Sequence, residues 1–519
     1  MRGSFRRLTG AADSAVSEMT FEFLSLLGSG LTVAFTLNNL GFALIGCLLG
    51  TLIGVLPGIG VLATIAMLLP LTVGLSATTS MIMLAGIYYG AQYGGSTTAI
   101  LVNLPGEATS VVTCLDGYKM AQQGRGGVAL FVAAVGSFLA GCIGTVIIAA
   151  FAPPLAEMAL RFNGPENFSL MMLALVASAL FSGGKLLQAL AMLVLGVLLG
   201  LVGTDVETGT LRYTLGLSGL YDGVNFVAVV MGFFGLAEVV NNIANPSIDR
   251  STTNVIGRFW PTRKELRQAL PASLRGTLLG AALGVLPGGG VVISPFASYI
   301  LEKRLAKDPS RFGQGAIEGV AGPESANNAS AQTSFIPMLT LGIPANPVIA
   351  LLLGAMIIQG IQPGPEVMAK HPELFWGLIA SMLVGNLMLL VINLPLIGLW
   401  VRLLKIPYRM LFPAVLVFCC IGAYTLNNAT FDVILLAVFG IAGIVLSVLD
   451  FPIIPLVLGL ILGPLAEEHL RRAMLIARGD PMVFIERPIS AVILAVTAIM
   501  IISYIYIVIR EKRRFPSNE

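Results

Sequence analysis

GTLIGVLPGIG at residues 50–60 and GAALGVLPGGG at residues 280–290 share the pentapeptide GVLPG. The copies begin at Gly54 and Gly284, which places them 230 residues apart in a chain of 519, and Gly60 also matches Gly290. A helix kink that occurs twice by coincidence is the alternative. A match of this length at nearly half-chain spacing instead predicts two related halves.

Composition predicts that these halves lie in a membrane. The chain is 56% hydrophobic and 11% charged, whereas soluble domains hold about 45–50% apolar and about 25% charged residues. So few charges cannot cover a soluble surface of this size. We therefore expect an all-α, polytopic membrane protein of roughly 10–12 transmembrane helices, with some segments that do not cross fully.

The distribution of charged and polar residues divides the chain into five predicted parts. The predicted parts are a polar N-terminal segment 1–20, a first transmembrane repeat 21–245, an interfacial linker 246–268, a second repeat 269–510 and a basic tail 511–519. Trp260 and the cationic residues of the linker are typical of a membrane interface. Arg2, Arg6 and Arg7 at one end and Arg510 to Arg514 at the other place both termini in the cytoplasm, which requires an even number of crossings.

Each half also holds Pro-containing breaks within apolar sequence, at Pro57 and Pro105 in the first half and at Pro287 and Pro344 in the second. Proline removes a backbone donor, and glycine beside it, as at Gly58 and Gly288, permits the turn. A helix that restarts after the break presents free N–H groups to an anion. Paired interrupted segments indicate the binding site of a secondary transporter.

A polar stretch inside apolar sequence supplies the candidate substrate or ion ligands of each half. Small hydroxyls and amides can bind a carboxylate, or a sodium ion through oxygen; the alternative is that they only pack helices closely. The candidates are Gly95, Ser96, Thr97, Thr98 and Asn103 in the first half, and Glu324, Asn327, Asn328, Ser330, Gln332, Thr333 and Ser334 in the second.

Few ionisable residues fall deep in the apolar sequence. Glu324 could carry a coupling proton or help to hold a cation, or it could lie at the membrane surface. Asp116, Lys119 and Glu107 are interpreted as loop residues. The five cysteines show no metal-ligand spacing, so we predict no bound metal apart from a transient sodium ion.

No catalytic motif is present: the sequence contains no HExxH, no GxSxG and no phosphate-binding GxxxxGK[ST]. We therefore predict a protein that is not an enzyme, needs no cofactor, and draws on an ion gradient rather than on ATP. A net charge of +3 without a basic stripe gives no indication of nucleic-acid binding.

Five motifs taken together resemble the large membrane subunit of the tripartite tricarboxylate transporters. They are GVLPGIG with AMLLPLT, GIYYGAQYGGSTTAILVNLPGE, DGYKMAQQGRGGVAL, GVLPGGG with ISPFASYILEKRL, and GVAGPESANNASAQTSFIPMLTLGIP followed by ALLLGAMIIQGIQPGP. With the surrounding spans they cover about residues 21–505 in family order. One departure is LGIPAN at 341–346, where Ala345 and Asn346 replace a Gly-Ser pair common in the family.

The resemblance implies an inner-membrane permease that imports an organic acid by symport with protons or sodium. Its implied partners are a periplasmic solute-binding protein and a small membrane subunit. It also implies an inverted repeat with paired re-entrant hairpins that work by elevator-like alternating access. The stretch Ser96–Gly106 would be one hairpin tip and Glu324–Ser334 its counterpart.

Other readings stay open at this point. The chain could be the permease of the tripartite class that handles dicarboxylates and sialic acid, or a passive channel for ions or solutes. An intramembrane enzyme would need a nucleophile or an acid pair in mid-span, which we do not find. The sequence does not name the carboxylate, the coupling ion or the oligomeric state.

Overall fold

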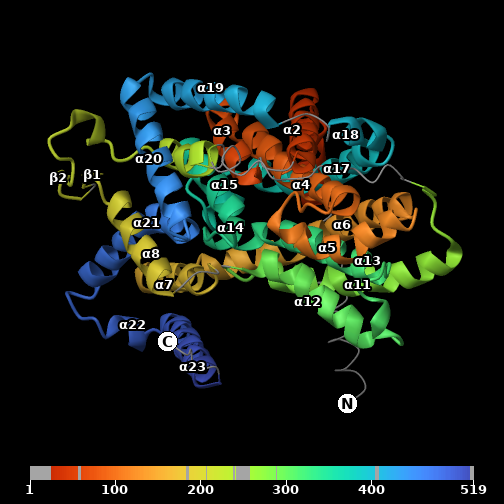
Figure 1. Ribbon diagram of the computed structural model, residues 1–519. Coiled ribbons are helices and arrows are strands. Elements are labelled where there is room, and N and C mark those ends of the chain that lie inside the picture. The colour runs from red at the N-terminus through yellow and green to blue at the C-terminus, as the bar shows by residue number, and fades with distance from the viewer. Residues whose placement is uncertain are drawn as a thin grey trace, which may run out of the picture.

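The computed structural model describes residues 25–56, 60–182, 186–205, 207–237, 240, 257–287, 289–403 and 408–514. Nearly all regular structure in these residues is helical, and β1–β2 is the only sheet among them. Figure 1 shows the helices gathered into one assembly, with α22 and α23 at one corner. The prediction of an all-α, polytopic membrane protein is confirmed.

Elements of the first half precede residue 240. They are α2 (Leu37–Val55), α3 (Val61–Thr72), α4 (Ala77–Val102), η1 (Ala108–Ser110), α5 (Val111–Gln122), α6 (Gly126–Ala159), α7 (Gly164–Leu180), α8 (Leu186–Gly200), β1 (Gly203–Thr204), β2 (Leu211–Arg212), η2 (Ser218–Leu220), α9 (Phe226–Val230) and the π-helical η3 (Met231–Leu236).

Elements of the second half follow residue 257. They are α11 (Arg263–Gly284), α12 (Gly290–Leu305), η4 (Pro309–Arg311), α13 (Glu318–Thr333), α14 (Phe335–Leu341), α15 (Pro347–Ile358), α16 (Glu366–Lys370), α17 (Pro372–Asn393), α18 (Ile397–Leu403), α19 (Tyr408–Asn427), α20 (Thr430–Val448), α21 (Ile454–Ile476), α22 (Val483–Glu486) and α23 (Pro488–Arg514).

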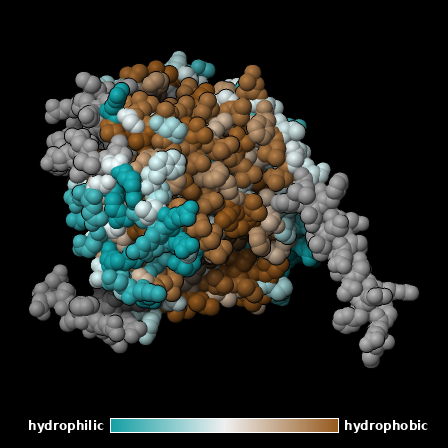
Figure 2. All heavy atoms as spheres, turned by 90° about the vertical axis from the view of Figure 1, so that its right-hand side faces the viewer, coloured by the Kyte–Doolittle hydropathy of each residue, from teal (hydrophilic) through white to brown (hydrophobic). Residues whose placement is uncertain are grey.

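Of the described helices, five are long and apolar enough to cross a membrane: α2, α6, α17, α20 and residues 488–506 of α23. Seven further apolar helices are shorter, as expected where segments stop partway. Figure 2 shows a broad zone of hydrophobic side chains on one face, with hydrophilic side chains gathered along its edge. The expected number of crossings stays a prediction. α11 begins at Arg263, inside the predicted linker, and residues 1–20, 246–256 and 515–519 lie outside the described part.

A ladder of glycines joins the first and third helices of each half. A Cβ atom at Gly46, Gly50 or Gly54 of α2 would collide with the carbonyl oxygens of residues 83, 87 and 91 on α4. The same applies to Gly276, Gly280 and Gly284 of α11 and the carbonyls of residues 322, 326 and 330 on α13. Helices approach this closely only when small residues line the contact. The equivalent glycines are again 230 residues apart, so the two halves share one packing scheme.

The open ends of the two hairpins, α2–α3 and α11–α12, contact different segments of the chain. At the first, Gln359 Nε2 donates to Thr72 O, 2.8 Å away, and to Ser80 Oγ at 3.1 Å. At the second, Gln123 Nε2 donates to Gln314 O over 2.7 Å, beside the start of α11. α4 and α5 lead the chain from the first end to the second, and α13 to α15 lead it back.

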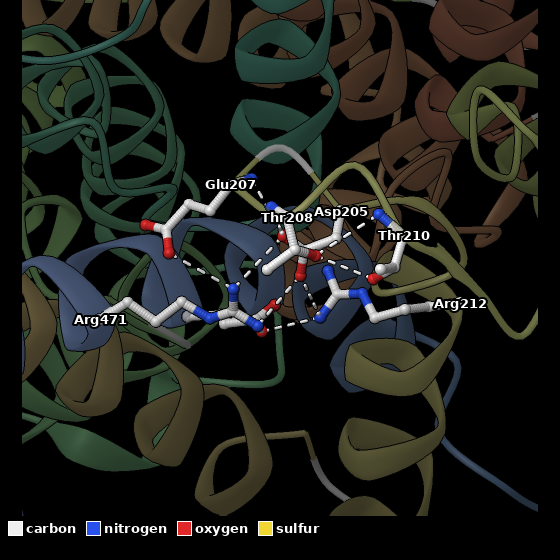
Figure 3. A network of polar contacts seen from close by, with 7 residues as sticks. Asp205, Glu207, Thr208, Thr210, Arg212 and Arg471 are labelled. Carbon is white, nitrogen blue, oxygen red and sulfur yellow. Dashed lines mark hydrogen bonds and ion pairs between the residues drawn. The ribbon is translucent and has the colours of Figure 1, made fainter.

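The β1–β2 ladder pairs Gly203 with Arg212 in antiparallel register and is fastened to α21 by ion pairs (Figure 3). Arg471 lies 3.0 Å from Asp205 and 2.5 Å from Glu467, and Arg212 lies 2.7 Å from Glu467. The Thr208 N–H, then that of Glu207 and the two guanidinium groups, lower the pKa of Asp205 to about 2. We call the cluster of Asp205, Arg212, Glu467 and Arg471, which joins the β1–β2 hairpin to α21, the hairpin latch.

Candidate functional site

A cavity of about 410 Å³ lies where the breaks of both halves meet. The first half contributes the start of α3 and the turn after α4, and the second contributes the start of α12 and the turn before α15. Its polar or break-forming lining residues are Gly60, Tyr88, Gln92, Pro105, Gly106, Glu107, Thr109, Val291, Asn346 and Pro347. A concave, mostly apolar space with a few convergent polar groups is the usual form of a small-molecule site.

The predicted breaks at Pro105, Pro287 and Pro344 lie in turns between helices, and Pro105 lines the cavity. Pro57, Gly58 and Gly288 lie outside the described residues. Asn103 ends α4 in the left-handed conformation, with φ 57°, and is exposed. At Pro105, Pro287 and Pro344 the structure therefore has turns that follow the ends of helices.

Glu107 is a cavity residue that the sequence reasoning treated as an ordinary loop residue. Its Oε1 accepts a hydrogen bond from the Val61 N–H, 3.1 Å away, at the start of α3. Free N–H groups at that position were expected to receive an anion, and here a carboxylate of the protein occupies one of them. The signal that could have revealed this role is the acid that directly follows the NLPG turn.

Most of the two stretches predicted as hairpin tips is helical, and only residues 103–106 of the first stretch lie in a turn. Gly95, Ser96, Thr97 and Thr98 lie within α4, and residues 324–333 lie within α13. Several hydroxyl groups here donate hydrogen bonds to backbone carbonyls one turn earlier. Thr333 donates to the Ala329 carbonyl and Ser334 to the Ala331 carbonyl. The turn 103–107 follows α4, and the turn 342–346 lies between α14 and α15.

Glu324 is fully buried on α13 and joins the two halves. Its Oε2 accepts a hydrogen bond from Ser96 of α4, and its Oε1 accepts one from Thr113 of α5. The Ser96 hydroxyl has a second acceptor within reach, the Gln92 carbonyl at 3.1 Å. No ion pair to Glu324 is found among the described residues. A buried acid held by hydroxyls alone can bind a proton or a cation without breaking an ion pair.

Gln92 connects Glu324 to the cavity. Its side chain lines the cavity and accepts a 2.8 Å hydrogen bond from Thr109, while its carbonyl is the alternative acceptor for Ser96. The sequence reasoning did not select Gln92, because a lone glutamine within an apolar helix gives no signal by itself.

Asn327 is the predicted ligand with the clearest unmet bonding capacity. Both atoms of its buried side-chain amide lack a hydrogen-bond partner, and so does Gln332 Oε1. Leaving such groups unpaired costs about 1–3 kcal/mol each, so Asn327 has the donor and the acceptor to bind a polar ligand. Asn328 is different, because its Nδ2 donates to Ser137 Oγ at 2.7 Å. Ser330 bonds to Ser294 at 2.8 Å, which gives it a packing role.

A second, very small void of about 10 Å³ lies on the other side of Ser96. Thr97, Tyr93, Ser137 and Asn393 line it, and the Tyr93 hydroxyl and Asn393 Oδ1 have no partner. This is about the space of one water molecule. Only Ser96 and Thr97 were expected here, since Ser137 and Asn393 belong to distant helices that no sequence spacing connects.

Asp116 and Lys119 lie in α5 and not in a loop, which corrects the interpretation made from the sequence. Asp116 is buried, and its Oδ1 accepts from the N–H groups of Gly313, Gly315 and Ala316 at 2.7–2.9 Å. Its Oδ2 accepts from the Tyr299 hydroxyl at 2.9 Å. The carboxylate therefore anchors α5 to the segment that leads into α13.

Asn346, where the sequence departs from the family pattern, forms hydrogen bonds through both atoms of its side-chain amide. Its Oδ1 accepts from Ile349 N at 3.0 Å and caps α15, and its Nδ2 donates to Tyr88 at 3.2 Å. Asparagine is a preferred N-cap residue. The turn is therefore well formed, and an amide faces the cavity where the family commonly has a serine.

Comparison with known proteins assigns the chain. The sequence model of the tripartite tricarboxylate transporter TctA family matches residues 40–458 of this chain. An uncharacterised 52.8 kDa protein of the TAR-I ttuC' 3' region of Agrobacterium vitis is 55% identical over 492 residues, which is 95% of this chain and 98% of that protein.

A second Agrobacterium vitis protein, from the TAR-II ttuC' 3' region and also uncharacterised, is 61% identical over 234 residues. That match covers 45% of this chain and 97% of the relative. No solved structure matches the chain significantly. The chain belongs to the tripartite tricarboxylate transporter TctA family.

Proposed function

We propose that the chain is the large permease subunit of a binding-protein-dependent tripartite system that imports tricarboxylates or related organic acids. It is a secondary active transporter of the inner membrane, driven by a proton or sodium gradient, with a periplasmic solute-binding protein and a small membrane subunit as partners. The observation that carries this proposal is the cavity where broken segments of both halves meet, next to a buried acid held only by hydroxyl groups.

We further propose that the two halves form an inverted repeat. The shared glycine ladders support a common packing scheme, and the different contacts at the two open ends are consistent with opposite orientations in the membrane. Hairpins that enter from both sides bring their tips together near mid-depth, where inverted-repeat transporters bind their substrates. The basic end of α23 supports a cytoplasmic location for its side of the molecule.

In this proposal the substrate lies in the 410 Å³ cavity, with its carboxylates facing the amide N–H groups of Gln92 and Asn346. The coupling ion binds at Glu324. When the acid is neutralised, Ser96 can turn its hydroxyl from Glu324 to the Gln92 carbonyl. Because Gln92 also lines the cavity, occupancy of the acid and the shape of the cavity are connected through two residues.

The test is uptake of labelled citrate and dicarboxylates into vesicles that contain this chain and its small partner, with the binding protein added outside. Proton and sodium gradients are imposed separately. We expect uptake to require the binding protein and one of the two gradients. The gradient that drives uptake identifies the coupling ion. Uptake that is indifferent to both would overturn the proposal in favour of a passive channel.

Glu324→Gln keeps the size of the side chain and removes its charge, so we expect gradient-driven uptake to fall by about a hundredfold or more. Exchange of labelled substrate across the membrane without a gradient should fall less. The matched control is Glu468→Gln on α21, an exposed acid 2.7 Å from Arg472. Equal losses in both variants would show that Glu324 has no special role.

A further inference from the structure

A polar cavity of about 500 Å³ lies at the open end of the α11–α12 hairpin, away from the substrate cavity. Four cations line it: Arg267, Arg275, Lys307 and Arg311. Three acids line it as well: Glu302, Asp308 and Glu318. The proposed transport function uses none of these residues.

The three acids already have partners. Arg275 forms a two-pronged pair with Glu302, at 2.7 and 2.6 Å, and Arg311 lies 2.8 Å from Glu318. Asp308 accepts from Ser310 N and Oγ, and the Ser310 hydroxyl and N–H lower the pKa of that carboxyl. Arg267 and Lys307 are exposed and form no ion pair with any described residue. Among the described residues, Arg267 and Lys307 are therefore the two lining cations without an ion pair, and Asp308 is the one lining acid without a cationic partner, so the cavity carries one excess positive charge.

An exposed apolar stripe runs along α11 beside this cavity. Leu266, Leu270, Leu274 and Leu278 follow one another at four-residue spacing, and all are exposed. Arg267, Pro271 and Arg275, each one residue further along the chain, line the cavity. Consecutive helix positions are turned by about 100°, so the stripe and the cavity occupy adjacent faces of one helix.

Aromatic residues place this end of α11 at the membrane surface. Trp260 is 69% exposed and packs on Phe131, with ring centroids 5.3 Å apart. Tryptophan gathers at the depth of the lipid headgroups. Cationic side chains at that depth and a leucine stripe leading inward match the two parts of a phospholipid, an anionic headgroup and an acyl chain.

We propose that this cavity and the adjacent leucine stripe form a binding site for one anionic phospholipid. The phosphate lies between Arg267 and Lys307, and an acyl chain follows Leu270 and Leu274. Because α11 also carries the glycine ladder to α13, the lipid holds the open end of the hairpin whose helices support Glu324.

The test is native mass spectrometry of the purified full chain in detergent, with equal amounts of phosphatidylglycerol and phosphatidylcholine added. We expect the wild type to retain phosphatidylglycerol preferentially. Two membrane-surface cations together correspond to roughly a thirtyfold preference, which the double variant Arg267→Gln/Lys307→Gln should lose. Lys303→Gln/Arg304→Gln removes the same charge from exposed positions of α12 that do not line the cavity and should keep the preference.

Two further arms separate a lipid from a free phosphate. Leu270→Ser/Leu274→Ser should weaken phosphatidylglycerol binding although every cation remains, and excess inorganic phosphate should not displace the lipid. Equal loss of preference in the cavity and control variants, no effect of the leucine variant, or displacement by phosphate would each overturn the proposal. The leucine variant keeps the test decisive should the cation variant fail to fold.

Discussion

Two buried carboxylates connect the halves of this molecule, and their donors differ in kind. Asp116 accepts from three backbone N–H groups and one tyrosine hydroxyl. Glu324 accepts from two side-chain hydroxyls, one of which has another acceptor nearby. Backbone N–H groups can only donate and cannot turn, so they fix a charged acceptor. Hydroxyls rotate and can also accept, so they can serve a charged, a protonated or a cation-bound acid.

The two acids are physically linked, because Thr113 and Asp116 lie one turn apart on α5. One face of this helix is therefore held to the segment before α13, while the neighbouring side chain serves Glu324. We infer that Asp116 is a fixed anchor and that Glu324 is the exchangeable group.

Asp116→Ala should destabilise the fold most. It leaves the buried N–H groups of Gly315 and Ala316 and the half-buried N–H of Gly313 unpaired, at a cost on the order of 1–3 kcal/mol for each buried group. We expect a large fall in the yield of monodisperse protein and in its apparent melting temperature in detergent. Lys119→Ala, an exposed position one turn further along α5, is the control and should behave as the wild type. A stable Asp116→Ala protein would remove the anchor role.

Thr113→Val should affect transport more than stability. Valine has nearly the shape of threonine and lacks the hydroxyl that Glu324 accepts from. We expect gradient-driven uptake to fall roughly tenfold, which corresponds to one hydrogen bond to a charged group. Thr113→Ser retains the hydroxyl and should recover most of the uptake. If valine lowers the melting temperature and leaves uptake unchanged, Thr113 belongs with the anchor.

Tyr299→Phe removes one of the four donors to Asp116 and leaves the three backbone bonds in place. The expected loss is about 1 kcal/mol, with uptake per folded molecule unchanged. Chemical unfolding in mixed micelles would measure it. A loss comparable to that of Asp116→Ala would mean that the phenol, and not the backbone, provides the anchor.

The hairpin latch supplies a third carboxylate, outside the membrane, for comparison by pH. The folded-state pKa of Asp205, about 2, lies below its ordinary value of 3.8. Its stabilising contribution is therefore complete above about pH 4 and is lost as the pH falls through about 2. Pepsin cleavage within residues 203–212 should rise over that interval. Asp205→Asn should remove the pH difference, and a midpoint near pH 4 in the wild type would contradict the lowered pKa.

Much of the architecture could be predicted because it depends on local pattern. The repeated GVLPG, the low charge and the prolines at 105, 287 and 344 indicated helices, related halves and breaks. Glu324, Ser96 and Asn327 could be selected because polar side chains are costly within a membrane segment and therefore indicate a specific role. The roles of Gln92 and Asp116 could not, since they depend on partners elsewhere in the chain, up to 200 residues away, as from Asp116 to Ala316. The helical continuity of the polar stretches was missed because small residues resemble a turn in sequence.

The glycine ladders have a genetic consequence. At Gly46, Gly50, Gly54, Gly276, Gly280 and Gly284 even a methyl group meets the carbonyl of a neighbouring helix. Every single-base missense change in a glycine codon adds at least a methyl group. We therefore expect no tolerated missense change at any of these six codons. Gly41, on the same helix as the first ladder but with open space around it, is free of this constraint. Random mutagenesis of α2 should therefore recover functional substitutions at Gly41 and none at Gly50.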